Sequence, residues 1–108
     1  MNDFKLKTKA NIGVTTVGIY TVPASTSTTI LGITLANVSG SGINVTVGIS
    51  RTSADDVSLI KNVPIPQGSS LEFMQGNKII LESDDAVTVK SDVLNSLDVS
   101  LSILEMVD

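Results

Sequence analysis

Few side chains in this sequence could perform catalysis, because its 108 residues include no cysteine and no histidine. Thiolate and imidazole metal sites, cysteine or histidine nucleophiles and redox pairs are therefore excluded for these residues. Serine is abundant, but a serine nucleophile needs a neighbouring base, and without histidine only a lysine or the amino terminus could act as one. The composition predicts that the protein is not an enzyme and takes no cofactor or small-molecule substrate.

Carboxylates are the remaining candidates, and they gather in two places. Asp55 and Asp56 are adjacent, and so are Asp84 and Asp85, with Glu82 nearby. Oxygen-rich loops hold calcium when they offer about six to eight ligands, but this spacing is not that of a known calcium loop. Adjacent aspartates between strands mostly solvate a turn and accept backbone hydrogen bonds. We therefore expect turn residues here, with no bound metal.

The charge is unevenly distributed along the chain. Seven basic and eleven acidic residues give a net charge of −4, whereas Lys5, Lys7 and Lys9 face only Asp3 in the first nine residues. An acidic chain repels phosphate backbones, so no nucleic-acid partner is expected. Lysines at alternate positions are typical of one solvated face of an edge strand, where they discourage unwanted pairing. The alternative is a basic arm that seeks an acidic partner.

The elements that carry these residues are predicted to be strands. Valine, isoleucine and threonine supply 35 of the 108 residues, and such β-branched side chains pack well on a pleated surface. Alternation of apolar and polar residues predicts strands at Leu31–Ala36, Ile43–Ser50, Val87–Lys90 and Leu97–Ile103. Weaker candidates are Ile12–Val22, Val57–Val63, Ser70–Phe73 and Lys78–Leu81. After Ile103, Leu104 and Met106 make the outer face of the last strand apolar as well, so its end is expected to touch a neighbour.

Turn residues separate these runs at intervals of roughly 8 to 15 residues. This spacing, with no amphipathic helical stretch, predicts an all-β fold: an antiparallel two-sheet β-sandwich, jelly-roll-like, with about eight strands. Residues 1–11 are expected to be an N-terminal arm or edge strand, and residues 12–108 a single sandwich domain. Ser39–Gly42 should close a hairpin, because its two glycines permit a positive φ. Pro64 and Pro66 place their segment at a sheet edge or at a crossing between sheets.

Aromatic residues are scarce, since Phe4, Tyr20 and Phe73 are the only ones. Modules that stack sugars or bases display broad aromatic faces, which this sequence lacks. Tyr20 is expected in a strand with its hydroxyl at the rim. No apolar run reaches the roughly 18 residues of a membrane helix, and the start lacks the layout of a signal peptide. We therefore expect no membrane partner and synthesis in a cytoplasm.

Four segments, together with Val45–Val47, carry a family resemblance: Ile19–Asn37, Leu59–Leu71, Lys78–Asp85 and Leu97–Ser102. They resemble the strand-and-turn pattern of small β-sandwich virion structural proteins of tailed bacteriophages, over about 90 of the 108 residues. One departure is at Glu82–Asp85, where the pattern has Glu-x-Gly-Asp and this chain has aspartate in place of the glycine. That departure bears on the conformation of the turn.

The resemblance implies a non-enzymatic virion component of the head, neck or tail, made in the host cytoplasm, with other virion proteins and copies of itself as partners. Subunits of such assemblies bury edge strands, apolar strand ends and terminal arms against one another. The arm Phe4–Lys9 and the strand Leu101–Val107 are the expected contacts. The predicted interface residues are Phe4, Lys5, Leu6, Lys7, Leu101, Ile103, Leu104 and Met106. The alternative is a carbohydrate- or receptor-binding sandwich module, with its site in the loops Thr52–Asp56 and Gln67–Ser70.

Overall fold

The described part of the chain consists of β-strands and their connections. The computed structural model describes residues 2–52, 54–73 and 78–107, with residue 73 described by its backbone alone. These residues form nine strands and no helix: β1 (Asn2–Ile12), β2 (Val17–Thr21), β3 (Thr26–Asn37), β4 (Ile43–Ser50), β5 (Val57–Ile65), β6 (Ser70–Phe73), β7 (Ile79–Leu81), β8 (Ala86–Ser91) and β9 (Leu97–Val107). The all-β prediction is confirmed, and each strand expected from alternation lies within β3, β4, β8 or β9. Of the residues described, none belongs to a helix that could cross a membrane.

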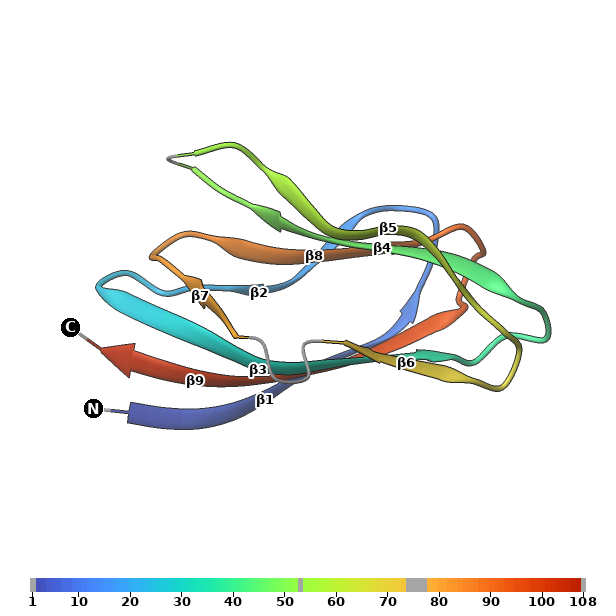
Figure 1. The fold of residues 1–108 in the computed structure, drawn as a ribbon, viewed down its shortest axis with the longest axis horizontal. Helices are drawn as coiled ribbons and strands as arrows, with labels where there is room; N and C mark the ends of the chain where they lie inside the picture. Colours follow the sequence, from blue (N-terminus) through green and yellow to red (C-terminus); the bar gives the residue numbers. More distant parts are fainter. Residues whose placement is uncertain (1, 53, 74–77, 108) are drawn as a thin grey trace.

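The strands form two antiparallel sheets that pack face to face (Figure 1). One sheet has the order β1-β9-β3-β6, with β7 also paired to β3, and the other has the order β2-β8-β4-β5. The chain turns back between β4 and β5, and each strand before that turn pairs with a counterpart after it: β4 with β5, β3 with β6 and β7, β2 with β8, and β1 with β9. A long hairpin rolled into two sheets in this way is a jelly roll. The predicted two-sheet sandwich is confirmed.

β6 and β7 act as two parts of one edge strand. β6 pairs with residues 33–36 of β3, and β7 pairs with residues 28–30, both in the antiparallel sense. Counted as one edge, they reduce the nine described strands to the eight of a jelly roll. The sequence has turn-forming residues, Gln75-Gly-Asn77, between these two strands, and the turn that they predict lies outside the described residues.

Ser39–Gly42 does not close a hairpin, so that prediction is wrong. β3 is paired on both sides, by β9 and by β6 and β7, and therefore has no free edge for β4. The segment instead carries the chain from one sheet to the other. Asn37 organises this crossing, because its Nδ2 donates to the carbonyl oxygens of Ser41 (2.8 Å) and Ile65 (3.0 Å). Among the described glycines only Gly68 has a positive φ, of 71°.

Two prolines lie where β5 ends and the chain crosses to the other sheet. Pro64 lies in β5, an edge strand of the four-stranded sheet, and Pro66 follows where the chain leaves for β6 in the other sheet. The prediction of an edge or a crossing is therefore confirmed.

Asp84, which stands where the resembled virion-protein pattern has glycine, has a φ of 71°. This is the left-handed region, in which glycine is unstrained and aspartate is strained.

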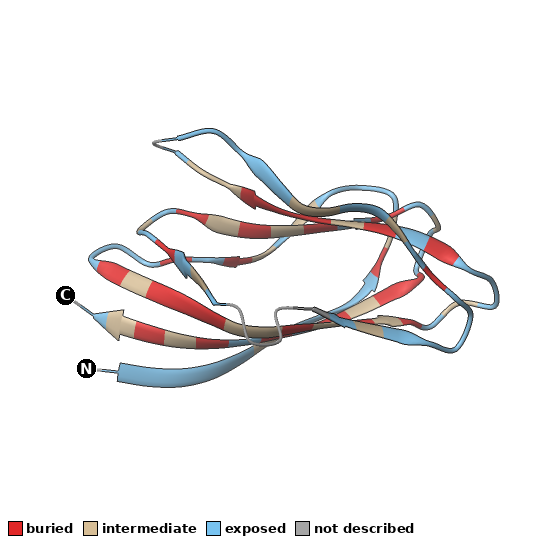
Figure 2. Cartoon of the chain, in the orientation of Figure 1, coloured by how far each residue is buried: buried red, intermediate tan, exposed pale blue. Residues whose placement is uncertain are grey.

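The core between the sheets is aliphatic. The largest fully buried side chains are Ile30, Ile33, Leu35, Ile65, Leu81, Leu97, Leu101, Ile103, Val22, Val45, Val47 and Val87. Figure 2 shows β3, β8 and β9 banded with buried residues, whereas β1 is exposed along most of its length. Tyr20 is also buried, and its hydroxyl bonds to Thr28 and Glu105 between the sheets. The expectation that this hydroxyl lies at the rim is therefore wrong.

Candidate functional site

An apolar patch covers part of the outer face of the five-stranded sheet. Phe4 lies opposite Leu104 in the β1–β9 ladder, Leu104 opposite Thr29 in the β9–β3 ladder, and Thr29 opposite Ile80 in the β3–β7 ladder. Directly opposed residues point to the same face of a sheet, so this row crosses four strands over about 14 Å. Side chains two residues farther along β1 and β9 extend the row. We call Phe4, Leu6, Ile80, Leu104 and Met106 the outer patch.

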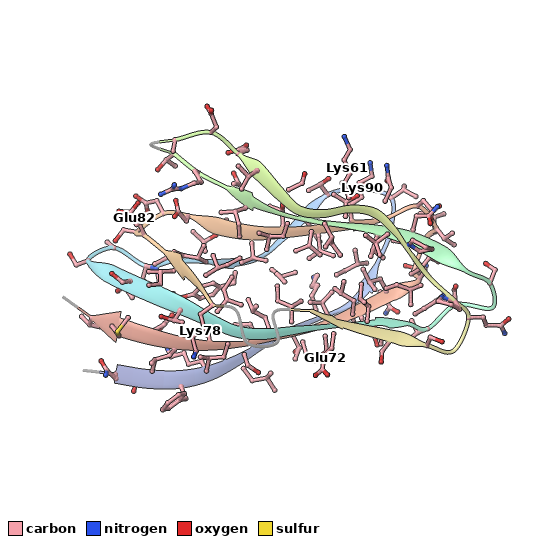
Figure 3. All side chains as sticks on the ribbon, viewed as in Figure 1. Lys61, Glu72, Lys78, Glu82 and Lys90 are labelled. Carbon is pink, nitrogen blue, oxygen red and sulfur yellow. The ribbon has the colours of Figure 1, made fainter. Side chains whose placement is uncertain are left out.

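The outer patch is open to solvent. Phe4, Ile80 and Leu6 expose 76%, 67% and 64% of their surface, and the other two members are half-buried. The same sheet face is polar farther along, where Thr34 lies opposite Glu72 and its Oγ1 donates to the Glu72 carboxylate at 3.3 Å. Figure 3 shows Glu72 pointing away from the sandwich. A cluster of exposed apolar side chains bordered by polar residues is the arrangement expected of a contact surface.

The outer patch contains four of the eight predicted interface residues: Phe4, Leu6, Leu104 and Met106. Leu101 and Ile103 alternate with Leu104 along β9 and are 0% exposed in the core. They support the sheet from inside and offer no side-chain surface to another subunit in this fold. Ile80 joins the patch from β7, a strand of three residues. The pairing of β7 with β3 determines which side of the sheet the Ile80 side chain faces. The residues around Ile80 do not reveal this pairing.

The remaining two predicted residues, Lys5 and Lys7, point toward the inside of the sandwich, because they lie opposite buried residues of β9. Lys5 Nζ is 2.7 Å from Oε1 of Glu105, whose side chain is 6% exposed. Lys7 Nζ lies 5.9 Å from the centre of the Tyr20 ring, within the range of a cation–π contact. The prediction of a purely solvated lysine face is therefore wrong for these two lysines. Inward-pointing charges are one means of protecting a sheet edge.

A buried polar network connects four strands beneath Lys5. The Tyr20 hydroxyl donates to Oε2 of Glu105 and lies 2.8 Å from Oγ1 of Thr28. The hydrogen bond from Lys5, followed by that from Tyr20, holds the pKa of Glu105 below its ordinary value. Burial, followed by the bond to Glu105, raises the pKa of Tyr20 to about 12. Glu105 is therefore a fixed negative charge that anchors β1.

A groove of about 350 Å³ lies on the outer face of the four-stranded sheet. The polar side chains that line it are Thr16, Thr46, Ser50, Asp56, Ser58, Thr88 and Lys90. A Cβ atom on Gly48 would lie 2.9 Å from the carbonyl oxygen of Val57, so only glycine fits this part of the floor. Of the two loops predicted to bind ligand, Thr52–Asp56 contributes Asp56, and its residue 53 lies outside the described residues. Gln67–Ser70 contributes nothing to the groove.

Ser58, in this groove, and Lys61 have the only Ser-x-x-Lys spacing in the sequence. A serine nucleophile requires its base within hydrogen-bond reach. Lys61 does not line the groove, and Figure 3 shows its side chain, like that of Lys90, pointing away from the sandwich. The arrangement therefore does not place the amine as a base for the hydroxyl.

The acidic residues accept backbone hydrogen bonds at turns, as predicted, and they also form ion pairs, which were not predicted. Arg51 pairs through Nη2 with Glu82 and through Nε with Asp85, at 3.2 Å from Oδ1. Asp85, which is 2% exposed, also accepts the backbone N–H of Glu82 at 2.9 Å. Asp56 accepts the backbone N–H of Arg51 at 2.7 Å. Within residues 2–52, 54–73 and 78–107, no group of three or more acidic side chains is placed to hold a metal ion.

Known structures share this fold at low sequence identity. No family model and no curated protein matches the sequence. A structure of the Bacillus endospore appendages, a family of disulfide-linked pili, superimposes with a TM-score of 0.60 and 16% identity, covering 99% of this chain and 87% of that chain. The capsid structure of Helicobacter pylori bacteriophage KHP30 gives a TM-score of 0.57 and 12% identity, covering 97% of this chain and 92% of that chain. The chain therefore shares its β-sandwich fold with structural proteins of a pilus and of a phage capsid.

Proposed function

We propose that this chain is a non-enzymatic structural protein of a bacteriophage virion, which stabilises or connects subunits of the head, neck or tail. The observation that carries the proposal is the outer patch, where the side chains of Phe4, Leu6 and Ile80 are mostly exposed on one sheet face. Exposed apolar side chains gathered on one face in this way mark sites that a partner buries. The partners are further copies of this chain and other virion proteins, and synthesis takes place in the host cytoplasm.

The two structural neighbours support a role in assembly, since one belongs to pili and the other to a phage capsid. The pili are disulfide-linked, whereas these 108 residues contain no cysteine. Contacts between copies through these residues would therefore not be disulfide bonds, and apolar burial is the main favourable term in most protein association. The outer patch supplies that surface.

The first test is whether the outer patch drives self-association. Replacing Phe4 and Ile80 with serine removes exposed apolar surface without emptying the core, so the stability of the single subunit should change little. We expect the unmodified chain to elute as an oligomer in size-exclusion chromatography with light scattering. The double variant Phe4→Ser/Ile80→Ser should need a protein concentration at least about tenfold higher to associate, because each buried apolar side chain contributes more than about 1.4 kcal/mol.

Leu94→Ser is the matched control. Leu94 is 70% exposed but lies in the connection between β8 and β9, outside the outer patch. Equal weakening by this control, or a monodisperse monomer at high concentration for the unmodified chain, would contradict the proposal. Immunogold labelling of particles from the source adds the location. Gold on a head, neck or tail supports a virion role, and its absence from particles argues against one.

The groove on the four-stranded sheet favours a second candidate function, a carbohydrate- or receptor-binding module. Its threonine and serine hydroxyls, with Asp56 and Lys90, offer the donors and acceptors that a polar ligand needs. Among the described residues that line it, none is aromatic, although sugars usually stack on an aromatic side chain. A glycan array with the unmodified chain and Ser58→Ala tests this function. A glycan bound by the first and lost by the second supports it, whereas an array without a binder contradicts it.

A further inference from the structure

β1 is long and well paired but hardly buried. Residues 2–9, which we call the arm, pair without a break with residues 99–106 of β9. Within β1, all of which the structure describes, only Ile12 is buried and Lys7 is intermediate. Figure 2 shows the same contrast between β1 and its banded neighbour β9. The backbone ladder and a few polar contacts therefore hold the arm, with almost no contribution from core packing.

The arm ends at a break in the strand. The ladder register shifts between Lys9 and Ile12, and Asn11 has a φ of 56°. On the far side of the break, Ile12 is 2% exposed and its carbonyl oxygen accepts the Ser96 N–H at 3.0 Å. The Asn11 N–H donates to Oδ1 of Asp98 at 3.0 Å. The chain is thus fixed in the sandwich from Ile12 onward, and we call residues 10 and 11, which join it to the arm, the hinge.

We propose that the arm is exchanged between copies of this chain: in the assembly, residues 2–9 of one subunit pair with β9 of a second subunit in place of their own. This proposal rests on the proposed function and names the strand that joins the subunits. A second copy fits because it presents the same β9 that already receives the arm. Exchange of an identical element is a low-cost route to association.

Exchange preserves the contacts of the arm. In the second subunit, Lys5 would meet the same buried carboxylate of Glu105, and Phe4 would meet Leu104. The arm carries three lysines and one aspartate, whereas the whole chain has a net charge of −4, so the arm is attracted to the body of another copy. The hinge changes, because Asn11 can leave its left-handed conformation for an extended one.

The effective concentration of β9 near the arm determines whether the arm pairs with β9 of its own subunit or with β9 of a second copy. In an isolated subunit the tether keeps the arm near its own β9 at an effective concentration in the millimolar range. Subunits held side by side by the outer patch offer each other's β9 at a similar effective concentration, and exchange then links them. The exchanged form should therefore increase with protein concentration and with assembly.

Mixing two single-cysteine variants tests the exchange. Thr8 lies opposite Ser100 in the β1–β9 ladder, beside Leu6 on the outer sheet face but not itself a member of the outer patch, and the chain has no cysteine of its own. A Thr8→Cys chain and a size-tagged Ser100→Cys chain are folded together at high concentration and then oxidised. We expect a disulfide-linked heterodimer on non-reducing gels, because the arm of one chain lies against β9 of the other.

Two controls define the outcome. The double variant Thr8→Cys/Ser100→Cys gives the disulfide yield that this pair allows within one chain. Thr34 also lies opposite Ser100, but in the β3–β9 ladder inside the sheet, so a Thr34→Cys chain mixed with the Ser100→Cys chain should give only background heterodimer. A Thr8/Ser100 heterodimer at several times this background supports exchange. A yield equal to background, with complete closure of the double variant, overturns it.

The hinge gives an independent readout. Glycine adopts the φ of Asn11 without strain, whereas a β-branched residue does not. Asn11→Gly should therefore lower the heterodimer yield and Asn11→Val should raise it, and equal yields would contradict the hinge. Light scattering on the reduced samples separates the two proposals. Association without the heterodimer overturns exchange and leaves the role of the outer patch intact, whereas a monomer in every sample overturns both.

Discussion

Tyr20, Glu105 and Lys5 form the polar link that attaches the edge strand to the inside of the sandwich. They come from β2, β9 and β1, so the link crosses from one sheet to the other. Removing one partner leaves the other buried polar groups unsatisfied, which costs more than the bond itself contributes. A single ionised carboxylate therefore helps to determine where β1 lies.

Titration of Tyr20 reports directly on this link, because the chain has one tyrosine and no tryptophan. Burial and the bond to Glu105 raise its pKa from the ordinary 10.0 to about 12. Since the pKa is raised on folding, the stabilisation is complete below pH 10.0 and is lost as the pH rises toward 12. Ultraviolet absorbance should show tyrosinate near pH 12 in the native chain and near pH 10 in denaturant. Native ionisation near pH 10 would contradict the burial.

Asp84 offers a substitution that should stabilise the fold. Its φ of 71° strains an aspartate, and its side chain is exposed, so Asp84→Gly removes strain without loss of packing. We expect the free energy of unfolding to rise by about 1 kcal/mol, measured by thermal or chemical unfolding followed by circular dichroism. Asp84→Ala is the control and should bring no such gain. An unchanged or lower stability for the glycine variant would show that the turn is not strained.

At the scale of elements, β9 shows what strand alternation can predict. Period two correctly located Leu97–Ile103 and indicated a second apolar face at Leu104 and Met106. The interface prediction nevertheless combined both faces, because it also included Leu101 and Ile103, which alternation assigns to the core. β1 could not be oriented from its sequence, since the partner of its inward-facing Lys5 is Glu105, which lies on a strand at the other end of the chain.

Deleting residues 1–9 should leave a folded sandwich. The arm contributes no buried side chain, and Ile12 remains in place. We expect cooperative thermal unfolding and a strand-rich circular dichroism spectrum, with a lower Tm because the ladder to β9 and the Lys5–Glu105 pair are lost. Incorporation into particles should be impaired. Normal incorporation would contradict a role for the arm in assembly, and loss of cooperative unfolding would show that the core depends on it.

At the scale of the molecule, the two-sheet architecture followed from local signals, whereas the strand order did not. Turn spacing and β-branched residues predict many short strands, and such strands must bury one face against another sheet. The order depends on pairings between segments far apart in the chain, such as β3 with β9. For that reason Ser39–Gly42 was wrongly predicted as a hairpin, and Ile80 of the outer patch was not recognised.

The salt dependence of self-association tests the effect of the net charge of the whole molecule, because copies that carry the same charge must come together. Each copy carries a net charge of −4, and none of the five outer-patch residues is ionisable. Salt at about 0.1 M limits electrostatic repulsion to a range of about 10 Å, while apolar contact persists. We therefore expect the apparent Kd for self-association, measured by light scattering, to fall severalfold between about 0.01 M and 0.15 M salt. Phe4→Ser/Ile80→Ser should associate more weakly at every salt concentration. Dissociation by salt would instead indicate that attraction between the basic arm and an acidic surface holds the copies together, and would contradict the outer patch as the main contact.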